Sequence, residues 1–376
     1  MKHIIQDLIL STLKKGLKNV GMIFISALLF ISVGVADARE IIDMAGRKVA
    51  IPDAIKKVYV PSPYGTYMVY SMDPTLLISF NNPSKEGRRY LHKAVQDLPV
   101  IGRIPGQDQQ SSIEAVLKAK PDLVIMWSAK KTIVMDEKAN DALNQLHLPI
   151  VYAVAESLND YPDVYLFMGK LLGMEERARE LSVYFQIALT EAKEIVDRIP
   201  KEKRPSVYYA EGADGLSTEC NDSVHVELLQ LAGDTNVHRC HTASHMGLEK
   251  ISLEQLTQYN PEVILASEVG FYDKVIREKD PAWQPIKAVK EGKVYLIPKV
   301  PFNWFDRPPS FMRIIGLKWL MSNLYPSQYK ADFNKEAREF YRIFLGVELS
   351  QEEMMRVISR EASIDESHGV GPGTQK

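Results

Sequence analysis

The stretch from residue 174 to residue 199, MEERARELSVYFQIALTEAKEIVDRI, has the most regular pattern in the chain. Its apolar residues recur in alternating steps of four and three, the spacing of one face of an amphipathic helix. At about 1.5 Å per residue such a helix is roughly 39 Å long, and Pro200 ends it. The pattern predicts a rod connecting two lobes, although a surface helix of one large domain or a short coiled-coil arm would show the same spacing. The apolar positions are Met174, Ala178, Leu181, Phe185, Ala188, Ala192, Ile195 and Ile199.

Two segments, one on each side of the rod, match each other at an offset of 140 residues. Residues 112–125, SIEAVLKAKPDLVI, align without a gap with residues 252–265, SLEQLTQYNPEVIL. Each copy predicts an N-capped helix, a proline stop, an acidic residue and a buried strand. A second similarity supports the match: residues 58–60 and 207–210 are each predicted to form the first strand of their half. Chance similarity is the alternative, but the matched Ser, Glu, Pro and acid favour two similar α/β halves.

The pattern therefore predicts an α/β fold with two similar lobes, each built on a mainly parallel sheet, joined by one long helix. Parallel sheets bind ligands at their strand ends, so a ligand cleft is expected between the lobes. Further predicted elements are a hairpin at 41–49, helices at 66–72, 224–232, 311–323 and 332–344, and strands at 76–80 and 294–297. The expected divisions are 1–38, a lobe at 39–160, linking helices at 161–200, a lobe at 201–360, and a disordered tail at 361–376.

The first 38 residues have the organisation of a cleavable secretory signal. Lys14, Lys15 and Lys18 precede an uncharged stretch at 20–35, and Ala36-Asp37-Ala38 fits a small-x-small cleavage site. A retained membrane anchor is the alternative, but the uncharged stretch is short for that role. A lipid-anchored form is disfavoured because no cysteine lies at the cleavage point. The protein is expected to be exported, and the mature chain is expected to begin near Arg39.

Charge and cysteine content exclude one class of function and indicate an oxidised protein. Without residues 1–38 the chain has 42 basic and 46 acidic side chains, so nothing indicates nucleic-acid binding, which needs a strongly basic face. Cys220 and Cys240 are the only cysteines, and an even number in an exported protein favours a disulfide. Closing a loop of that length could contribute about 3 kcal/mol.

With these features in place, the mature chain resembles the solute-binding proteins of ABC importers for iron-siderophore, haem and vitamin B12. The resemblance implies a monomer with two rigid lobes, a ligand held between them, and delivery to a permease and its ATPase in the inner membrane. The order and spacing of the matching features are specific for the family but not for the ligand. They are the 42–47 hairpin, Gly102 before the first repeat copy, the rod, 231–233 with 236–237, the second copy, and 307–310.

The resemblance also implies that an acidic residue on each lobe meets arginines of the permease. Glu254 matches that position in the second lobe, and the repeat proposes Glu114 for the first, with Glu137 as a competitor. An acid in the first turn of a helix is also favoured by the helix dipole. Ser111 and Glu114 have the spacing of a capping box, so docking and capping are both open and compatible.

Loops at strand ends supply the candidate ligand-binding residues. Aromatic side chains with a few cations suit a flat or chelated anionic ligand, through stacking and charge-assisted contacts, and Arg307 is the cation of choice. A surface or capping role for Arg307 and a core role for Trp127 remain alternatives. The candidates are Tyr64 with Gly65, Arg103, Trp127, Glu211, Thr218, Phe302, Trp304 and Arg307.

The segment 238–246, HRCHTASHM, gathers three histidines and a methionine within nine residues. Imidazoles bind nickel, iron, copper or zinc, or complete the coordination of a chelated metal. His241 and His245 are four residues apart and are the tentative metal ligands. A polar loop without a metal is the alternative, and Cys240 is excluded as a ligand if it pairs with Cys220.

The favoured hypothesis is a non-enzymatic periplasmic protein that captures a metal complex and has no intrinsic cofactor. A ferric siderophore or related iron complex comes first, a nickel or cobalt chelate second, and cobalamin or haem third. An exported metal-dependent hydrolase that uses the 238–245 loop is the alternative from a different class. It is disfavoured because the chain has neither a His-Glu-x-x-His nor a Gly-x-Ser-x-Gly motif.

Overall fold

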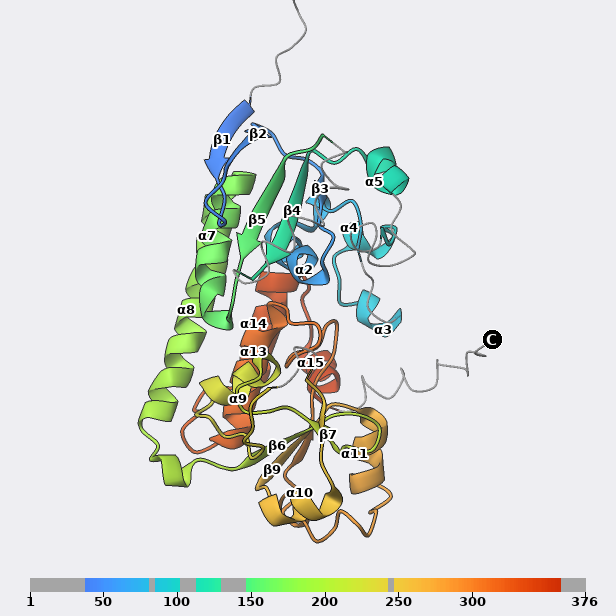
Figure 1. The fold of residues 1–376 in the computed structure, drawn as a ribbon, viewed down its shortest axis with the longest axis vertical. Helices are drawn as coiled ribbons and strands as arrows, with labels where there is room; N and C mark the ends of the chain where they lie inside the picture. The colour runs from blue at the N-terminus through green and yellow to red at the C-terminus, as the bar shows by residue number, and fades with distance from the viewer. Residues whose placement is uncertain (1–37, 81–84, 102–112, 130–146, 243–246, 360–376) are drawn as a thin grey trace, which may run out of the picture. The chain divides into compact units, whose positions relative to one another are not determined.

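The computed structural model describes residues 38–80, 85–101, 113–129, 147–242 and 247–359 (Figure 1). The chain divides into two compact units, 1–40 with 50–53, and 41–49 with 54–376. The described residues of the first unit are 38–40 and 50–53. They belong to a hairpin made by β1 (Ala38–Ile42) and β2 (Lys48–Pro52), at the end away from its turn. All elements below belong to the second unit. Residues 1–37 of the expected signal at 1–38, and the expected tail at 361–376, lie outside the described residues.

The N-terminal sheet has three parallel strands, β3 (Val58–Tyr59), β4 (Leu123–Ser128) and β5 (Ile150–Val154), with β4 in the middle. Helix α2 (Pro63–Met72) follows β3, and α5 (Ile113–Ala119) precedes β4. The strand expected at 76–80 is wrong. Asp73 accepts a hydrogen bond from the backbone of Thr75, which favours a short 3-10 turn at Pro74–Leu76, and only Leu77 forms an isolated bridge to Val58.

The C-terminal sheet repeats this order, because β6 (Val207–Ala210), β9 (Val263–Ala266) and β10 (Val294–Leu296) are parallel and β9 lies in the middle. Helix α10 (Leu253–Tyr259) precedes β9 as α5 precedes β4. A short antiparallel ribbon of β7 (Ser217–Thr218) and β8 (Glu249–Lys250) was not expected. The prediction of an α/β fold with mainly parallel sheets is confirmed.

The two repeat copies agree in their connections as well as in their sequence. Each helix ends at a residue in the left-handed region, Lys120 with φ 51° and Asn260 with φ 41°. The acid after each proline then binds the start of the neighbouring strand: Asp122 accepts from the backbone N–H of Lys57 at 2.8 Å, and Glu262 accepts from Ser206 at 3.1 Å. The matched acids therefore fix the register of the central strand in both sheets.

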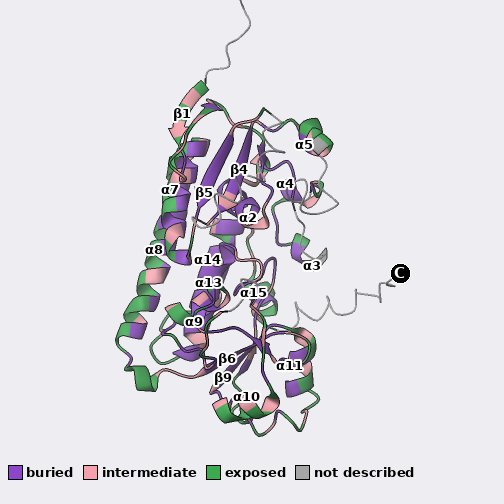
Figure 2. Cartoon of the chain, in the orientation of Figure 1, coloured by how far each residue is buried: buried purple, intermediate pink, exposed green. Residues whose placement is uncertain are grey.

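The predicted rod is helix α8 (Glu175–Asp197), which packs along α7 (Tyr161–Leu172) (Figure 1). One face of α8 is buried and the opposite face is exposed (Figure 2). A Cβ at Gly169 would lie 2.5 Å from the Cβ of Ala178, so glycine permits the close approach of the two helices. Lys318 of α13 (Met312–Leu324) donates to Glu191 of α8 at 2.7 Å, joining the rod to the C-terminal helices.

The remaining helices differ from their expected bounds mainly at their ends. The helix expected at 224–232 starts as a 3-10 turn, and the one expected at 332–344 ends in a π-helical turn at Tyr341–Leu345. Among the described residues no helix is both long enough and apolar enough to cross a membrane. The other segments are α3 (Lys85–Arg88), α4 (Lys93–Gln96), Leu158–Asp160, Lys201–Lys203, Val224–Val226, α9 (Glu227–Leu231), α11 (Val269–Ile276), α12 (Lys287–Lys290), α14 (Phe333–Phe340) and α15 (Gln351–Ile358).

Candidate functional site

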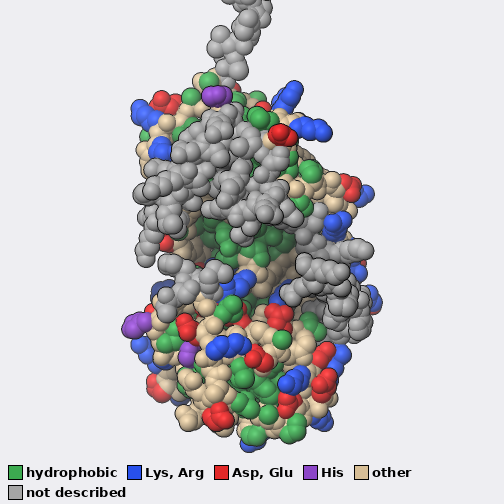
Figure 3. Space-filling view, turned by 45° about the vertical axis from the view of Figure 1, so that its right-hand side comes forward, with side chains coloured by type: hydrophobic (Ala, Val, Ile, Leu, Met, Phe, Trp, Pro, Cys, Tyr) green, Lys and Arg blue, Asp and Glu red, His purple; other side chains and the backbone are tan. Residues whose placement is uncertain are grey.

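The candidate site lies where segments leave the carboxyl ends of the parallel strands. Three residues separate the end of β3 from the start of helix α2, and the segment 297–311 follows β10. These two regions meet through Tyr67 and Phe302, whose rings stack at a centroid distance of 4.0 Å. The face in Figure 3 is hollowed, with a hydrophobic floor and side chains of both charges at its lower edge. The connections after the strands thus bring apolar and charged side chains together.

Arg307 is the centre of the charged part of this site. Its Nε lies 3.3 Å from Glu211 Oε1 and 3.3 Å from Asp306 Oδ2, and its Nη2 lies 2.5 Å from Glu219 Oε1. The three carboxylates are almost wholly buried, whereas the Arg307 side chain is 31% exposed. Burial lowers the pKa of Arg307, but the neighbouring carboxylates outweigh this effect and raise it above its usual value. Arg307 therefore stays charged and is held by three acids.

Glu211 is a carboxyl of this group with a raised pKa. Burial and the nearby charge of Glu219 raise the pKa of Glu211 to about 7, although the Arg307 guanidinium acts in the opposite direction. Its Oε2 is buried and accepts no hydrogen bond from any described residue. A carboxyl that ionises near neutral pH is typical of functional sites, but ion-pair networks have the same effect.

The Arg307 group consists of Arg307, Glu211, Glu219 and Asp306. A different arginine, which is buried, connects the segment of this group to the N-terminal sheet. Arg313 of α13 lies 2.8 Å from Glu227, whose Oε1 accepts from the backbone N–H of Leu158 just beyond β5. Arg313 also donates from Nε to the backbone carbonyl of Phe305 at 3.2 Å. Glu227 and Arg313 thus connect the segment after β5 to the segment that carries Asp306 and Arg307.

The aromatic candidates divide into two kinds. Trp127, near the end of β4, is partly exposed and packs edge-on against Tyr161 at 5.6 Å. Tyr64 is also partly exposed, and Gly65 beside it lets β4 approach, since a Cβ there would lie 3.1 Å from Trp127 Cβ. Trp304 is fully buried and donates from Nε1 to the carbonyl of Val300. Trp304 is therefore a core residue, whereas Tyr64 and Trp127 lie at the surface of the site.

The other predicted residues are mostly buried or outside the described chain. Phe302 is 4% exposed and Thr218, at the end of β7, is fully buried. Arg103 and His245 lie outside the described residues. Glu219, Glu227, Asp306 and Arg313 were missed by the sequence analysis, because an isolated charged residue in a loop or helix has no pattern that marks it as buried.

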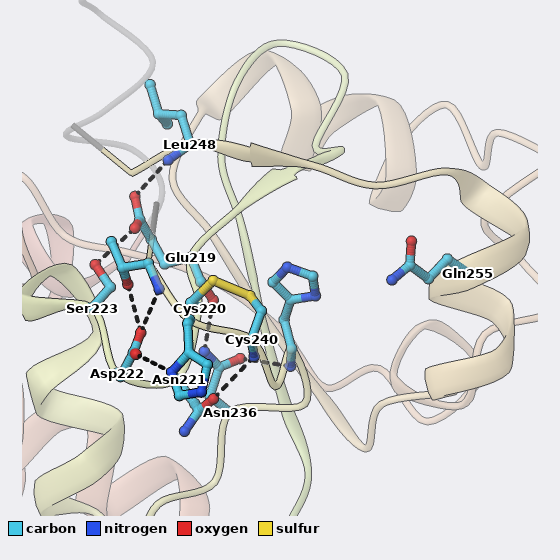
Figure 4. The surroundings of a disulfide bond; sticks show 12 residues. Glu219, Cys220, Asn221, Asp222, Ser223, Asn236, Cys240, Leu248 and Gln255 are labelled. Carbon is cyan, nitrogen blue, oxygen red and sulfur yellow. Dashed lines mark hydrogen bonds and ion pairs between the residues drawn. A yellow bond between two sulfur atoms is a disulfide. The ribbon is translucent and has the colours of Figure 1, made fainter. Parts of the chain in front are cut away.

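The structure contains a disulfide between Cys220 and Cys240 (Figure 4). Cys220 follows Glu219, and the backbone N–H of Cys240 donates to Asn221 Oδ1 at 3.2 Å. His238 and the two cysteine sulfurs lie within 4.8 Å of one another, but sulfurs joined in a disulfide are not thiolate ligands. The cysteines here tie the histidine-rich segment to the loop that carries Glu219.

The predicted metal ligand His241 is an exposed side chain whose Nδ1 lies 3.1 Å from Asp222. His238 is 8% exposed, and its Nδ1 lies 3.0 Å from the hydroxyl of Tyr259. Burial lowers the pKa of His238, which favours the neutral imidazole. His238 and His241 therefore have different partners in the described part of the chain.

The two proposed docking acids occupy equivalent positions in the first turns of α5 and α10, and both are exposed. Hydrogen bonds from its own backbone N–H and from Ser252 lower the pKa of Glu254. Both acids are therefore at the surface, where a partner could reach them. Glu137, the competitor of Glu114, lies outside the described residues.

Comparison with known proteins finds similarity to solute-binding proteins. Residues 98–301 match the family described as periplasmic binding protein. An ABC transporter solute-binding protein from Sulfurospirillum deleyianum is 40% identical, with a TM-score of 0.76 over 85% of this chain and 98% of that one. The molybdate-binding protein MolA of Haemophilus influenzae is 26% identical over 332 residues, covering 81% of this chain and 90% of MolA. The high-affinity heme uptake system protein IsdE of Staphylococcus aureus is 24% identical over 231 residues, 55% of this chain and 75% of IsdE.

Proposed function

The chain belongs to the periplasmic binding protein family, and from this we propose that it captures an iron-siderophore or related metal complex for an ABC importer. In this role it binds reversibly in the periplasm, after removal of its signal peptide, and delivers the complex to an inner-membrane permease and its ATPase. The supporting observation is the stacking of Tyr67 on Phe302, which joins helix α2, with its partly exposed Tyr64, to the segment that carries Arg307. The alternative within the family is a nickel or cobalt chelate or cobalamin.

The relatives bind ligands of different chemistry, so the choice depends on this chain's own residues. MolA binds molybdate by its name, and a free oxoanion is held by hydrogen-bond donors or positive charges that are not already paired with acids. Among the described residues, Arg307 is surrounded by three carboxylates, which repel a dianion and leave Arg307 little net charge to offer. A metal complex without net negative charge avoids this repulsion, and its flat organic groups can stack on Tyr64 or Trp127.

The ligand is best identified without assuming its chemistry. The mature protein is purified from the periplasm of its own host and studied by native mass spectrometry with elemental analysis. Stoichiometric iron with an organic chelator supports the proposal, and nickel or cobalt supports the alternative. Molybdenum would contradict both. Turnover of ester or peptide substrates that a chelator abolishes would instead support the hydrolase.

A titration of the purified protein then tests the charge argument. The probes are a ferric trihydroxamate, Ni(II) with L-histidine, haem and sodium molybdate, each followed by quenching of tryptophan fluorescence. We expect saturable binding of the ferric complex and no binding of molybdate. Tight molybdate binding with loss on Arg307→Gln would show that the guanidinium is available to an anion, against the present proposal.

Glu114 and Glu254 are proposed to dock on arginines of the permease. Replacing both with alanine should reduce uptake of the ligand by cells while leaving its affinity for the purified protein unchanged. Glu353→Ala is a matched control, because Glu353 is also an exposed acid in the first turn of a helix, α15, and hydrogen bonds with Ser350 lower its pKa. Equal uptake by the double variant and the control would exclude docking through these acids.

A further inference from the structure

Glu219 is a buried carboxylate that joins three separate segments. Its side chain is 0% exposed. Oε2 accepts from the hydroxyl of Ser223 at 2.8 Å, and Oε1 accepts from the backbone N–H of Leu248 at 3.0 Å (Figure 4). Oε1 also accepts from Arg307 Nη2 at 2.5 Å. One acid thus fixes the 3-10 turn after β7, the start of β8 and the guanidinium of the candidate site.

The backbone of Glu219 is fixed as firmly as its side chain. Its carbonyl accepts from Asn236 Nδ2 at 2.9 Å, and the next residue, Cys220, is covalently tied to Cys240. Gly247 closes the other side of the carboxylate at φ +61°, and a Cβ there would lie 2.1 Å from each carboxylate oxygen. Only glycine leaves room at that position. The carboxylate therefore has little freedom to move away from Arg307.

Glu219 cannot reach a ligand itself, because its side chain is fully buried, whereas Arg307 is 31% exposed. Glu211 holds the Nε side of the guanidinium and Glu219 holds Nη2. An arginine held at two separate nitrogens has a fixed plane, so its exposed edge presents hydrogen-bond donors in fixed directions.

We propose that Glu219 is a positioning residue for ligand recognition, which acts by fixing the guanidinium of Arg307. This inference rests on the proposed function in one respect, that Arg307 faces the ligand. The competing explanation is a purely structural role, in which Glu219 only stabilises the loop between β7 and α9. The two differ in one consequence: a positioning effect requires Arg307 to be present, whereas a loop-stabilising effect does not.

A double-mutant cycle separates these explanations. Glu219→Gln, Arg307→Gln and the double variant are titrated with the ferric trihydroxamate by tryptophan fluorescence. We expect Glu219→Gln to weaken binding about tenfold, as for loss of a charged hydrogen bond, and the double variant to bind no more weakly than Arg307→Gln. Wild-type affinity in Glu219→Gln, or effects that multiply fully in the double variant, would overturn the proposal.

Asp43→Asn is the matched control for a lost buried carboxylate. Asp43 has a fully buried side chain and binds Arg47 through Nε at 2.9 Å and Nη2 at 2.7 Å. This change should lower the melting temperature and leave ligand affinity unchanged. Glu219→Asp keeps the charge but shortens the side chain by one methylene, so its affinity should lie between those of wild type and Glu219→Gln.

A measurement without ligand keeps the inference separate from the proposed function. Exchange of the Arg307 Nη2 protons, which Glu219 binds, and the pKa of Glu211 are followed by NMR in wild type and Glu219→Gln. We expect at least tenfold faster exchange in the variant, and a lower Glu211 pKa because the Glu219 charge raises it. If wild type binds none of the metal complexes, the proposed function fails. Unchanged exchange would overturn the positioning role whatever the ligand is.

Discussion

Replacing Glu211 with glutamine should change how the stability of the protein depends on pH. The folded protein raises the pKa of Glu211 from 4.5 to about 7, mainly through burial and the charge of Glu219. Because the ionised form is disfavoured on folding, this carboxyl contributes stability that is fully present below pH 4.5. That contribution is lost as the pH rises through about 7. Glutamine cannot ionise, so the variant lacks this loss.

The size of the effect follows from the two pKa values. A shift from 4.5 to about 7 corresponds to about 3 kcal/mol when the group is fully ionised, since each unit is 1.36 kcal/mol. Between pH 5 and pH 8 the free energy of unfolding of wild type should therefore fall by roughly 2 to 3 kcal/mol relative to Glu211→Gln. The Glu211 side chain is only 5% exposed, so solvent screening reduces this value little.

Urea unfolding at pH 5, 6, 7 and 8, with the disulfide oxidised, measures the difference directly. Carbon-13 NMR of the Glu211 carboxyl gives its pKa in the folded state and does not depend on two-state unfolding. Glu262→Gln is a control of opposite sign, because a hydrogen bond from Lys287 lowers the pKa of Glu262. Parallel stability profiles for wild type and Glu211→Gln, or a folded pKa near 4.5, would refute the reasoning.

Three further changes test the framework around the site. Replacing Cys220 and Cys240 with serine should lower the free energy of unfolding by about 3 kcal/mol and weaken binding of the ferric complex. Urea unfolding of wild type and variant measures the first effect. Unaltered affinity would show that the disulfide does not support the binding site. Gly316→Ala should lower the melting temperature sharply, because its Cβ would lie 1.8 Å from a backbone oxygen. Glu227→Gln leaves Arg313 without its buried counter-ion and should cost about 3 kcal/mol, measured by urea unfolding; a loss below 1 kcal/mol would show that water solvates Arg313.

Several elements of the fold are decided locally and could be predicted from the sequence. The four-three spacing predicts the helix α8, whose buried face includes Ala178, Leu181 and Phe185. The repeat predicts that β4 and β9 have equivalent environments, and both are the central strands of parallel sheets. The error at 76–80 has a local cause that hydrophobicity does not reveal, because the Asp73–Thr75 hydrogen bond favours a turn there.

The candidate site could be predicted only in part. Strand-end position indicated Tyr64, Trp127 and Glu211, and charge indicated Arg307. The same reasoning named Trp304, which is fully buried. A tryptophan near a strand end can turn toward the core or toward the ligand, and only packing against neighbouring elements decides which.

By itself, the sequence determined the long helix α8, the central strands β4 and β9 and the duplicated α/β pattern, because periodicity, capping and proline stops act over a few residues. Only the tertiary structure decided that Arg307 is held by carboxylates, since Glu211 and Glu219 lie 96 and 88 residues away from it in the chain. Parallel strands whose carboxyl ends meet at one edge bring these distant residues together. The net charge around Arg307 therefore depends on contacts between residues far apart in the sequence, and no local sequence pattern predicts it.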